Sequence, residues 1–273
     1  MRIALLQVSK IESPLYLESY LQNCAKQNVE IVVLPEYTFE PFFRHLQSLP
    51  SPQLIASHNV SILRQLVVFA KEYNLEIIAP IVVDLYTLKL SGNRLSNTFY
   101  KTIALIDSQG YTFYVQQRLI DYPHWNEHAF FANKHYKKPK LPLTIERKGL
   151  KIGVLSGLEL HFDEIFIAMK VQSYDVLIVP CANTFDTLTR WRSLCKMRAF
   201  LNSCAILRVN RVGTEYVDKT SWNFYGDSLY VNAYGQIEDS LQDYEGLMIV
   251  SLHTESIQKA REMWHFHKPF AQT

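Results

Sequence analysis

Short apolar runs alternate along the chain with stretches in which apolar residues recur every three or four positions. The runs are rich in β-branched residues and have the length of strands buried on both faces, at 3–8, 29–34, 76–83, 152–155, 176–179 and 205–209. The stretches of helical period predict helices near 14–24, 62–70, 162–173, 188–202 and 254–264. Strands that alternate with helices predict an α/β fold in which helices cover sheets.

Between the two halves the pattern changes to the two-residue alternation of half-buried strands. Residues 97–106 and 111–115 flank the sequence DSQG at 107–110, which predicts a β-hairpin. Two later strands, 228–231 and 247–251, lie around a turn, AYG, at 233–235. The polar and aromatic segment 117–142 has neither period, and a loop of that length in a compact domain is usually functional.

The composition mainly excludes several classes of protein. The 273 residues are 48% hydrophobic and 20% charged, with a formal charge of +2, and no linker or repeat divides them, so we expect one soluble domain over 1–273. No apolar run approaches the roughly 20 residues that span a bilayer, and the opening MRIALLQVSK is too soon interrupted for a secretory signal. The one basic cluster, KHYKKPK at 134–140, is typical of a solvated loop, so no nucleic-acid or membrane partner is expected. Four cysteines without CxxC spacing predict free thiols in a reducing cytoplasm: Cys24, Cys181, Cys195 and Cys204.

Candidate chemistry lies at three points that each follow a predicted strand. Glu36 comes directly after an apolar run and a proline, where burial would raise its pKa towards that of a general base; the alternative is an ordinary surface glutamate. The hairpin ends at Gln116, within YVQQRLIDY. The third point is Ser156-Gly157, in KIGVLSGLELHFDE, at a turn between a strand and a helix. Open α/β sheets hold nucleophiles and ligands at such edges.

Together these motifs resemble the nitrilase, or carbon–nitrogen hydrolase, superfamily of amidases, nitrilases and N-carbamoyl amino-acid amidohydrolases such as β-alanine synthase. LPEY at 34–37 resembles the first motif of the family, with Glu36 as general base, and FYVQQRLIDY and IGVLSGLELHFDE resemble the second and third. Four later segments resemble further motifs in the right order: PCA at 180–182, RAFLN at 198–202, NRVG at 210–213 and YGDS at 225–228. The resemblance covers nearly the whole chain and implies a four-layer αββα sandwich.

The departures from the family pattern concern the catalytic positions. When the motifs are aligned, Gly157 stands at the position of the family's nucleophilic cysteine, and Gln116 stands at the position of its lysine. Leu158 and Glu159 stand where the family has a tyrosine and an aspartate after the cysteine. Asp163 stands where the family has a proline before the last glutamate of the motif. A second glutamate used by many family members falls near Glu127. Of the family's Glu-Lys-Cys triad only Glu36 remains.

The resemblance and these losses together predict a pseudoenzyme. The family's reaction needs a thiolate to attack the carbon of an amide or nitrile, a cation to stabilise the oxyanion, and a carboxylate to move the proton. Glycine supplies no nucleophile, and the Gln116 amide carries no charge. We therefore expect Glu36, Gln116 and Gly157 to converge at one cleft that binds a small amide-like or carboxylate ligand, with wall residues Glu127, Ser156, Glu159, Cys181 and Asn183.

Three alternatives remain open. An active hydrolase could use a relocated nucleophile, Cys181 or Ser156; Ser156 would point away in an extended strand, and Cys181 has no activator in the sequence and could be a small apolar filler. Glu159, His161 and Asp163 could form a metal site, but their spacing is more typical of an ordinary surface turn. No metal or organic cofactor is therefore expected. The family's habit of pairing helices implies a homodimer or higher homo-oligomer, through the tail helix with Trp264 and a helix bearing Trp191, Leu194, Cys195 and Met197; core packing is the other reading of these residues.

Overall fold

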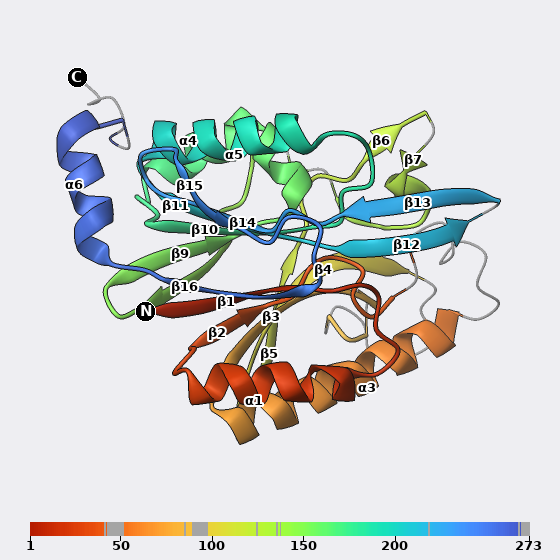
Figure 1. Ribbon diagram of the computed structural model, residues 1–273. Helices are drawn as coiled ribbons and strands as arrows, with labels where there is room; N and C mark the ends of the chain where they lie inside the picture. The colour runs from red at the N-terminus through yellow and green to blue at the C-terminus, as the bar shows by residue number, and fades with distance from the viewer. Residues whose placement is uncertain are drawn as a thin grey trace.

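Two six-stranded sheets face each other in this computed structural model, and helices cover their outer faces (Figure 1). The structure describes residues 1–40, 42, 52–84, 86–88, 98–123, 125–134, 136, 138–217, 219–266 and 268. The predicted four-layer αββα architecture is confirmed. The basic segment 134–140 lies only partly within the described residues, because positions 135 and 137 fall outside them.

The first sheet holds the N-terminal half of the chain and one C-terminal strand. Its order is β16 (Gly246–Ser251), β1 (Arg2–Gln7), β2 (Ile31–Val33), β3 (Glu76–Asp84), β4 (Phe99–Asp107) and β5 (Gly110–Val115). Strands β1, β2 and β3 are parallel, and the others pair antiparallel. The outer face carries η1 (Pro14–Leu17), α1 (Glu18–Lys26) and α3 (Pro52–Tyr73).

The second sheet has the order β15 (Ile237–Ser240), β14 (Leu229–Val231), β11 (Ala205–Asn210), β10 (Val176–Cys181), β9 (Leu150–Val154) and β8 (Leu143–Arg147). Its central strands β9, β10 and β11 are parallel. Helices α4 (Asp163–Lys170) and α5 (Leu188–Asn202) cover it, after the short η3 (Gly157–His161). Two small ribbons complete the chain, β12 (Val212–Val217) with β13 (Thr220–Tyr225) and β6 (Asp121–Tyr122) with β7 (Trp125–Asn126), the latter followed by η2 (Glu127–Ala129).

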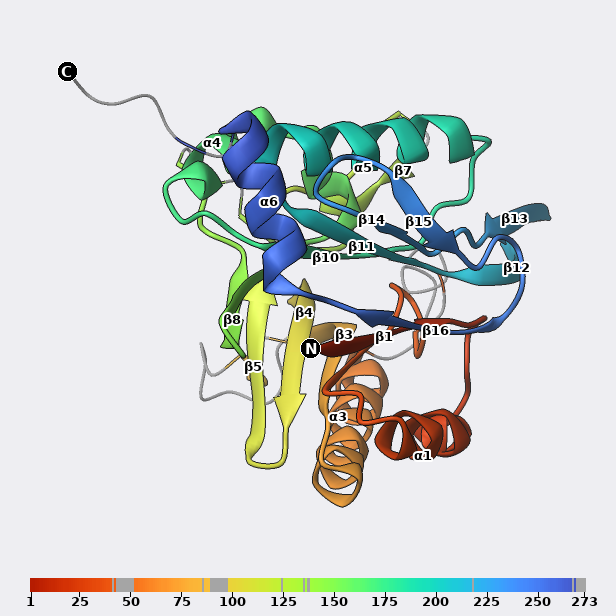
Figure 2. The same cartoon turned by 60° about the vertical axis from the view of Figure 1, so that its left-hand side comes forward.

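Alternate residues of the central strands enter two different cores. In β1, Ile3 and Leu5 pack between the sheets, whereas Ala4 and Leu6 pack under α1 and α3. Both faces are therefore buried, which is why these strands read as continuous apolar runs. Helix α6 (Thr254–Trp264) runs along one end of the sandwich (Figure 2), and its Ile257 joins the core between the sheets.

The sequence-predicted elements agree closely where the periodicity is long. The helices at 188–202 and 254–264 have the predicted bounds, and the predicted hairpin forms with a tighter turn, since Asp107 pairs with Gly110. The helix predicted from residue 14 begins instead as a 3-10 turn, so Leu15 and Tyr16 are exposed. Four short strands with mixed exposure were not predicted, β8, β12, β13 and β15. The two-residue strands β6 and β7 were not predicted either, because they lie in the segment 117–142 that was predicted to be a loop. None of the helices in the described ranges is long and apolar enough to cross a membrane.

A buried carboxylate fastens the segment after β2 to the helix layer. Glu40 is 2% exposed; its Oε1 accepts hydrogen bonds from the Val82 backbone N–H at 2.7 Å and from the Asn59 amide at 3.2 Å. Burial outweighs these hydrogen bonds and raises the pKa of Glu40 to about 7. The folded state therefore favours the protonated acid, and ionising it favours unfolding.

The Glu40→Gln variant should remove this pH dependence. In the natural chain the free energy of unfolding should fall as the pH rises from about 4.5 to about 7, by up to about 3 kcal/mol, since one pKa unit corresponds to about 1.4 kcal/mol. Glutamine keeps an acceptor for the Val82 N–H but does not ionise, so the variant should be the more stable protein above pH 7. Urea unfolding at several pH values measures this. The exposed Glu262→Gln is the control, and parallel pH profiles for Glu40→Gln and the natural protein would contradict the assignment.

Candidate active site

A cavity of about 380 Å³ opens where the strand ends of both sheets meet the segment after β5. Its floor is polar and its walls are mostly aromatic and apolar. Residues from both halves of the chain line it: Glu36, Tyr37, Lys101, Ile120, Tyr122, Trp125, Gly157, Leu158, His161, Cys181, Ala182, Asn183, Thr184, Phe185, Thr187, Arg190, Trp191 and Leu194. This volume is typical of a site for a small organic ligand.

A buried lysine lies between two carboxylates at the floor of the cavity. The Lys101 Nζ is 2.6 Å from Glu127 Oε1 and 3.4 Å from Glu36 Oε1, and the three residues come from β4, η2 and the segment after β2. Glu127 is fully buried and also accepts hydrogen bonds from the Tyr37 hydroxyl at 3.3 Å and the Ile120 N–H at 3.0 Å. These three contacts hold Glu127 in place beneath the ammonium group.

The two other groups of this cluster have shifted pKa values. Burial opposes protonation of Lys101, but the Glu127 and Glu36 carboxylates outweigh it and raise the lysine pKa. Burial also raises the pKa of Glu36, and Lys101 counteracts this only in part. The lysine therefore stays cationic, while Glu36 has the raised pKa that suits a proton acceptor.

Gln116, the residue aligned with the family's lysine, does not line the cavity. Its Nε2 donates to the Arg118 carbonyl at 2.6 Å, and its backbone N–H donates to the Lys101 carbonyl at 3.1 Å. This differs from the expected convergence of Gln116 with Glu36 and Gly157. The cation comes from the adjacent strand instead, a residue that the sequence analysis missed. The available signal was a single lysine in the otherwise mostly apolar strand FYKTIALID.

Gly157 does line the cavity, next to the thiol of Cys181. A Cβ added at Gly157 would lie 2.5 Å from Cys181 Sγ and 3.3 Å from Cys181 Cβ. The sulfur thus fills space that a side chain at position 157 would need. The Cys181 Sγ donates to the Val179 carbonyl at 3.4 Å, and the Cys181 carbonyl accepts the Glu36 N–H at 3.2 Å, so the two strand ends touch through their backbones.

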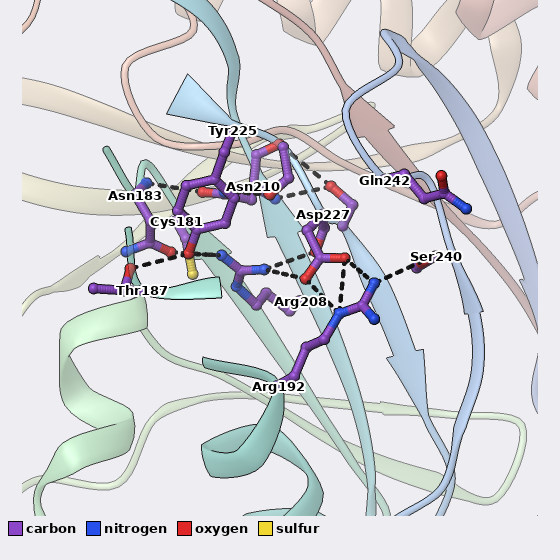
Figure 3. Close-up of polar contacts among 12 residues, drawn as sticks. Cys181, Asn183, Thr187, Arg192, Arg208, Asn210, Tyr225, Asp227, Ser240 and Gln242 are labelled. Atoms are coloured by element: carbon purple, nitrogen blue, oxygen red, sulfur yellow. Dashed lines mark hydrogen bonds and ion pairs between the residues drawn. The ribbon is translucent and has the colours of Figure 1, made fainter. Parts of the chain in front are cut away.

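A buried arginine network lies behind Cys181 (Figure 3). Arg208 of β11 is fully buried, and its guanidinium donates to the Asp227 carbonyl at 2.7 Å, to Asn183 Oδ1 at 2.8 Å and to the Tyr225 hydroxyl at 3.1 Å. The carboxylate of Asp227 lies 3.4 Å from Arg208 and 2.6 Å from Arg192. Asn183, a wall residue of the cavity, is oriented by this network.

Ser156 and Glu159 form part of the turn rather than the wall. Neither lines the cavity, in contrast to the expectation from the sequence. The Glu159 carboxylate is fully buried and accepts the Ser156 N–H at 2.9 Å, the Gln117 N–H at 2.6 Å and the Tyr114 hydroxyl at 3.0 Å. It fastens η3 to the end of β5, and burial raises its pKa. Across the described part of the chain no cluster of His, Cys, Asp and Glu could hold a metal ion.

Comparison with known proteins relates this arrangement to a family. The model of the carbon–nitrogen hydrolase family matches residues 15–262. The chain is 24% identical over 189 residues to N-carbamoylputrescine amidase of Solanum tuberosum, an alignment that covers 63% of this chain and 61% of that protein. It is 22% identical over 278 residues to citrullinase of Francisella tularensis, which covers 96% of this chain and 92% of that protein.

Comparison of the folds gives the same relationship at lower sequence identity. A crystal structure of a carbon–nitrogen hydrolase from Helicobacter pylori superposes with a TM-score of 0.78 at 18% identity, over 97% of this chain and 94% of that one. Since the family model covers most of the sequence and the fold agrees, this chain belongs to the carbon–nitrogen hydrolase family and is a low-identity relative of its amidases.

Proposed function

We propose that this protein binds the carbonyl group of a small amide or carboxylate between Lys101 and Glu36, and that residue 157 takes no part in the chemistry. The observation that carries the proposal is the Lys101 ammonium, which lines the cavity with Glu36 and lies 3.4 Å from that carboxylate and 2.6 Å from the buried Glu127 carboxylate. A glycine at position 157 has no nucleophilic group, so the family's usual thiol mechanism cannot operate at that position.

The charges at the floor complement an amide. Glu127 is occupied by Lys101, Tyr37 and Ile120, whereas Glu36 makes the longer contact with Lys101 and lines the cavity. A ligand carbonyl oxygen would accept from the ammonium, and a ligand N–H would donate to Glu36. A carboxylate ligand would bind in the same way once Glu36 is protonated, which its raised pKa favours. Hydrogen bonds to charged groups are strongest in such a water-poor site.

The relatives suggest which ligands to test first. The names N-carbamoylputrescine amidase and citrullinase refer to compounds with a carbamoyl group on an amine. A carbamoyl group offers one carbonyl oxygen and N–H donors, which fits the Lys101 and Glu36 pair. The apolar wall with Trp125 and Trp191 would contact the rest of such a ligand.

A second candidate function is hydrolysis by a relocated nucleophile. Of the two alternatives, Ser156 is buried in the turn and does not line the cavity. Cys181 does line it, beside Gly157. This difference favours Cys181 over Ser156 as the relocated nucleophile.

Removing the Lys101 charge should abolish tight binding. Lys101→Met would leave the buried Glu127 carboxylate without a cation, so the test uses Lys101→Met with Glu127→Gln, which removes both charges. Loss of hydrogen bonds to a charged group should raise the Kd about ten- to a hundredfold. Isothermal calorimetry with propionamide, citrulline and N-carbamoylputrescine measures it. The control is Lys71→Met, an exposed lysine of α3. An unchanged Kd in the double variant, or no binding of any of the three by the natural protein, would contradict the proposal.

We also propose that two copies associate through the outer face of α5 and the end of α6. Trp191 and Cys195 belong to the core, but Met197, Leu201 and Trp264 are 50%, 43% and 43% exposed. The Phe200 ring contacts Trp264, which joins the two helices into one apolar surface.

Leu201→Glu should therefore yield a monomer where the natural protein is a dimer, because a buried unpaired charge at an interface is strongly unfavourable. Sedimentation equilibrium at micromolar concentration measures the mass. Val68→Glu, at an exposed position of α3 on the opposite side of the molecule, is the control and should stay dimeric. A natural protein that sediments as a monomer would contradict the proposal.

A further inference from the structure

We infer that the cavity holds a second polar subsite, formed by Asn183, Thr184 and Arg190, which binds a carboxylate at the other end of the ligand. The inference rests on the proposed function, since the first end of the ligand must lie between Lys101 and Glu36. It goes further because it names the ligand class. That class is a short molecule with an amide or carbamoyl group at one end and a carboxylate at the other.

The three residues belong to one short segment, which follows β10 and leads into the first turn of α5. All three line the same cavity as Lys101 and Glu36. The segment comes from the second sheet, whereas Lys101 and Glu36 come from the first, so the two polar groups belong to different halves of the chain. Two separate polar groups in one cavity fit a ligand with two polar ends.

The orientation of the Asn183 amide is fixed by its contact with Arg208 (Figure 3). A guanidinium has only donors, so the Asn183 atom that lies 2.8 Å from Arg208 Nη2 must be the carbonyl oxygen Oδ1. The backbone N–H of Asn183 is also in use, since it donates to Asn210 Oδ1 at 2.9 Å. The Nδ2 group has no acceptor among the described residues, although Asn183 lines the cavity. It therefore remains as a donor for a ligand.

The Thr184 hydroxyl is a second polar group without a partner. Its Oγ1 atom is buried and makes no hydrogen bond within the described part of the chain. A buried polar atom without a hydrogen bond is unfavourable, and such atoms are uncommon in folded proteins. Because Thr184 lines the cavity, a ligand acceptor can supply the missing bond.

The exposed side chain of Arg190 adds a positive charge to the same wall. Arg190 stands in the first turn of α5, where the helix dipole favours an anion and where no acidic residue is present. Its Nη2 donates to the Asp186 carbonyl at 3.1 Å, and no carboxylate in the described ranges forms an ion pair with it. Asp186 itself is exposed and does not line the cavity. The Arg190 cation is therefore available to a ligand anion.

The charges that line the cavity favour an anionic ligand over a cationic one. Among the described lining residues Lys101 and Arg190 are cations, and Glu36 is the single carboxylate. Glu127 pairs with Lys101 but does not line the cavity. Burial lowers the pKa of His161, which favours its neutral form. A carboxylate only accepts hydrogen bonds, so it matches the three donors of the subsite, whereas an ammonium group would lie beside Arg190 with no wall carboxylate to pair with.

Three amides with the same spacer test the ligand class. At the end opposite the amide, succinamate carries a carboxylate, butyramide a methyl group and β-alaninamide an ammonium group. Isothermal calorimetry with the natural protein should give a Kd for succinamate about ten- to a hundredfold below that for butyramide, because hydrogen bonds to a charged group are added. β-Alaninamide should bind most weakly.

The possible results separate the subsite from the proposed function. Equal Kd values for succinamate and butyramide, or tightest binding of β-alaninamide, would overturn the subsite and leave the site at Lys101 and Glu36 in place. No binding of any of the three amides would reject the proposed function, and the subsite with it.

Asn183→Asp should reverse the charge preference. The aspartate keeps an oxygen for Arg208 but replaces the Nδ2 donor with a second oxygen, so the contact that orients the side chain is retained. The Kd of succinamate should rise about tenfold and that of β-alaninamide should fall, because the new carboxylate repels one ligand and attracts the other. Butyramide should bind as before. A parallel change for all three ligands would show a general effect on the cavity and would contradict the subsite.

Arg190→Gln should raise the Kd of succinamate about three- to fivefold, as expected for an exposed ion pair, and leave the Kd of butyramide unchanged. Arg64→Gln, at an exposed arginine of α3, is the matched control and should change neither value. Equal succinamate binding by Arg190→Gln and the control would exclude Arg190 from the subsite.

Thr184→Val should weaken succinamate binding without lowering the melting temperature. The hydroxyl has no hydrogen bond within the described residues to lose, so its removal should not destabilise the fold. Differential scanning calorimetry and isothermal calorimetry measure the two effects. A lower melting temperature would show that the hydroxyl serves the fold, and an unchanged Kd for succinamate would show that it does not contact the ligand; either result would remove Thr184 from the subsite.

Discussion

The ammonium of Lys101, shared by Glu36 and Glu127, is the interaction on which the cavity depends. Three charged groups from three separate segments meet there with little access to water. Each would be unfavourable alone in such a place, and together they are tolerated because every charge has an opposite one in contact. The arrangement fixes the end of β4 against the strand end of β2 and against η2. It also leaves one cation and one carboxylate facing the cavity.

Close packing explains how the side chains around Gly157 and Gln116 are arranged. An interior has no spare volume, so another group must fill the room beside Gly157, which has no side chain. The Cys181 sulfur fills it, and the tight approach of 2.5 Å to the missing Cβ shows that both side chains would not fit together. In the same way Gln116 turns its amide to the Arg118 carbonyl, and the cavity receives the Lys101 side chain from the neighbouring strand.

The buried arginines connect this pocket to the second sheet. Arg208 spans from Asp227 to Asn183, so it links the strand end of β11 to a residue on the cavity wall. Its charge also lies next to the one cysteine that lines the cavity. The guanidinium is fully buried and is held there by its hydrogen bonds to Asp227, Asn183 and Tyr225.

The sequence by itself determined the layers of the fold. Strands that are buried on both faces have continuous apolar runs, and a helix such as 254–264 has apolar residues at helical spacing. It also picked out Glu36 and Gly157, which both line the cavity, since motif order depends only on the chain. It did not find the short strands of mixed exposure, such as β8 and β12, whose pattern is local and weak. Nor could it find Lys101 or the fit of Cys181 against Gly157. Those depend on which residues the sheets bring within a few ångströms of each other, and that distance is set by cross-strand register and packing, which only the tertiary structure decides.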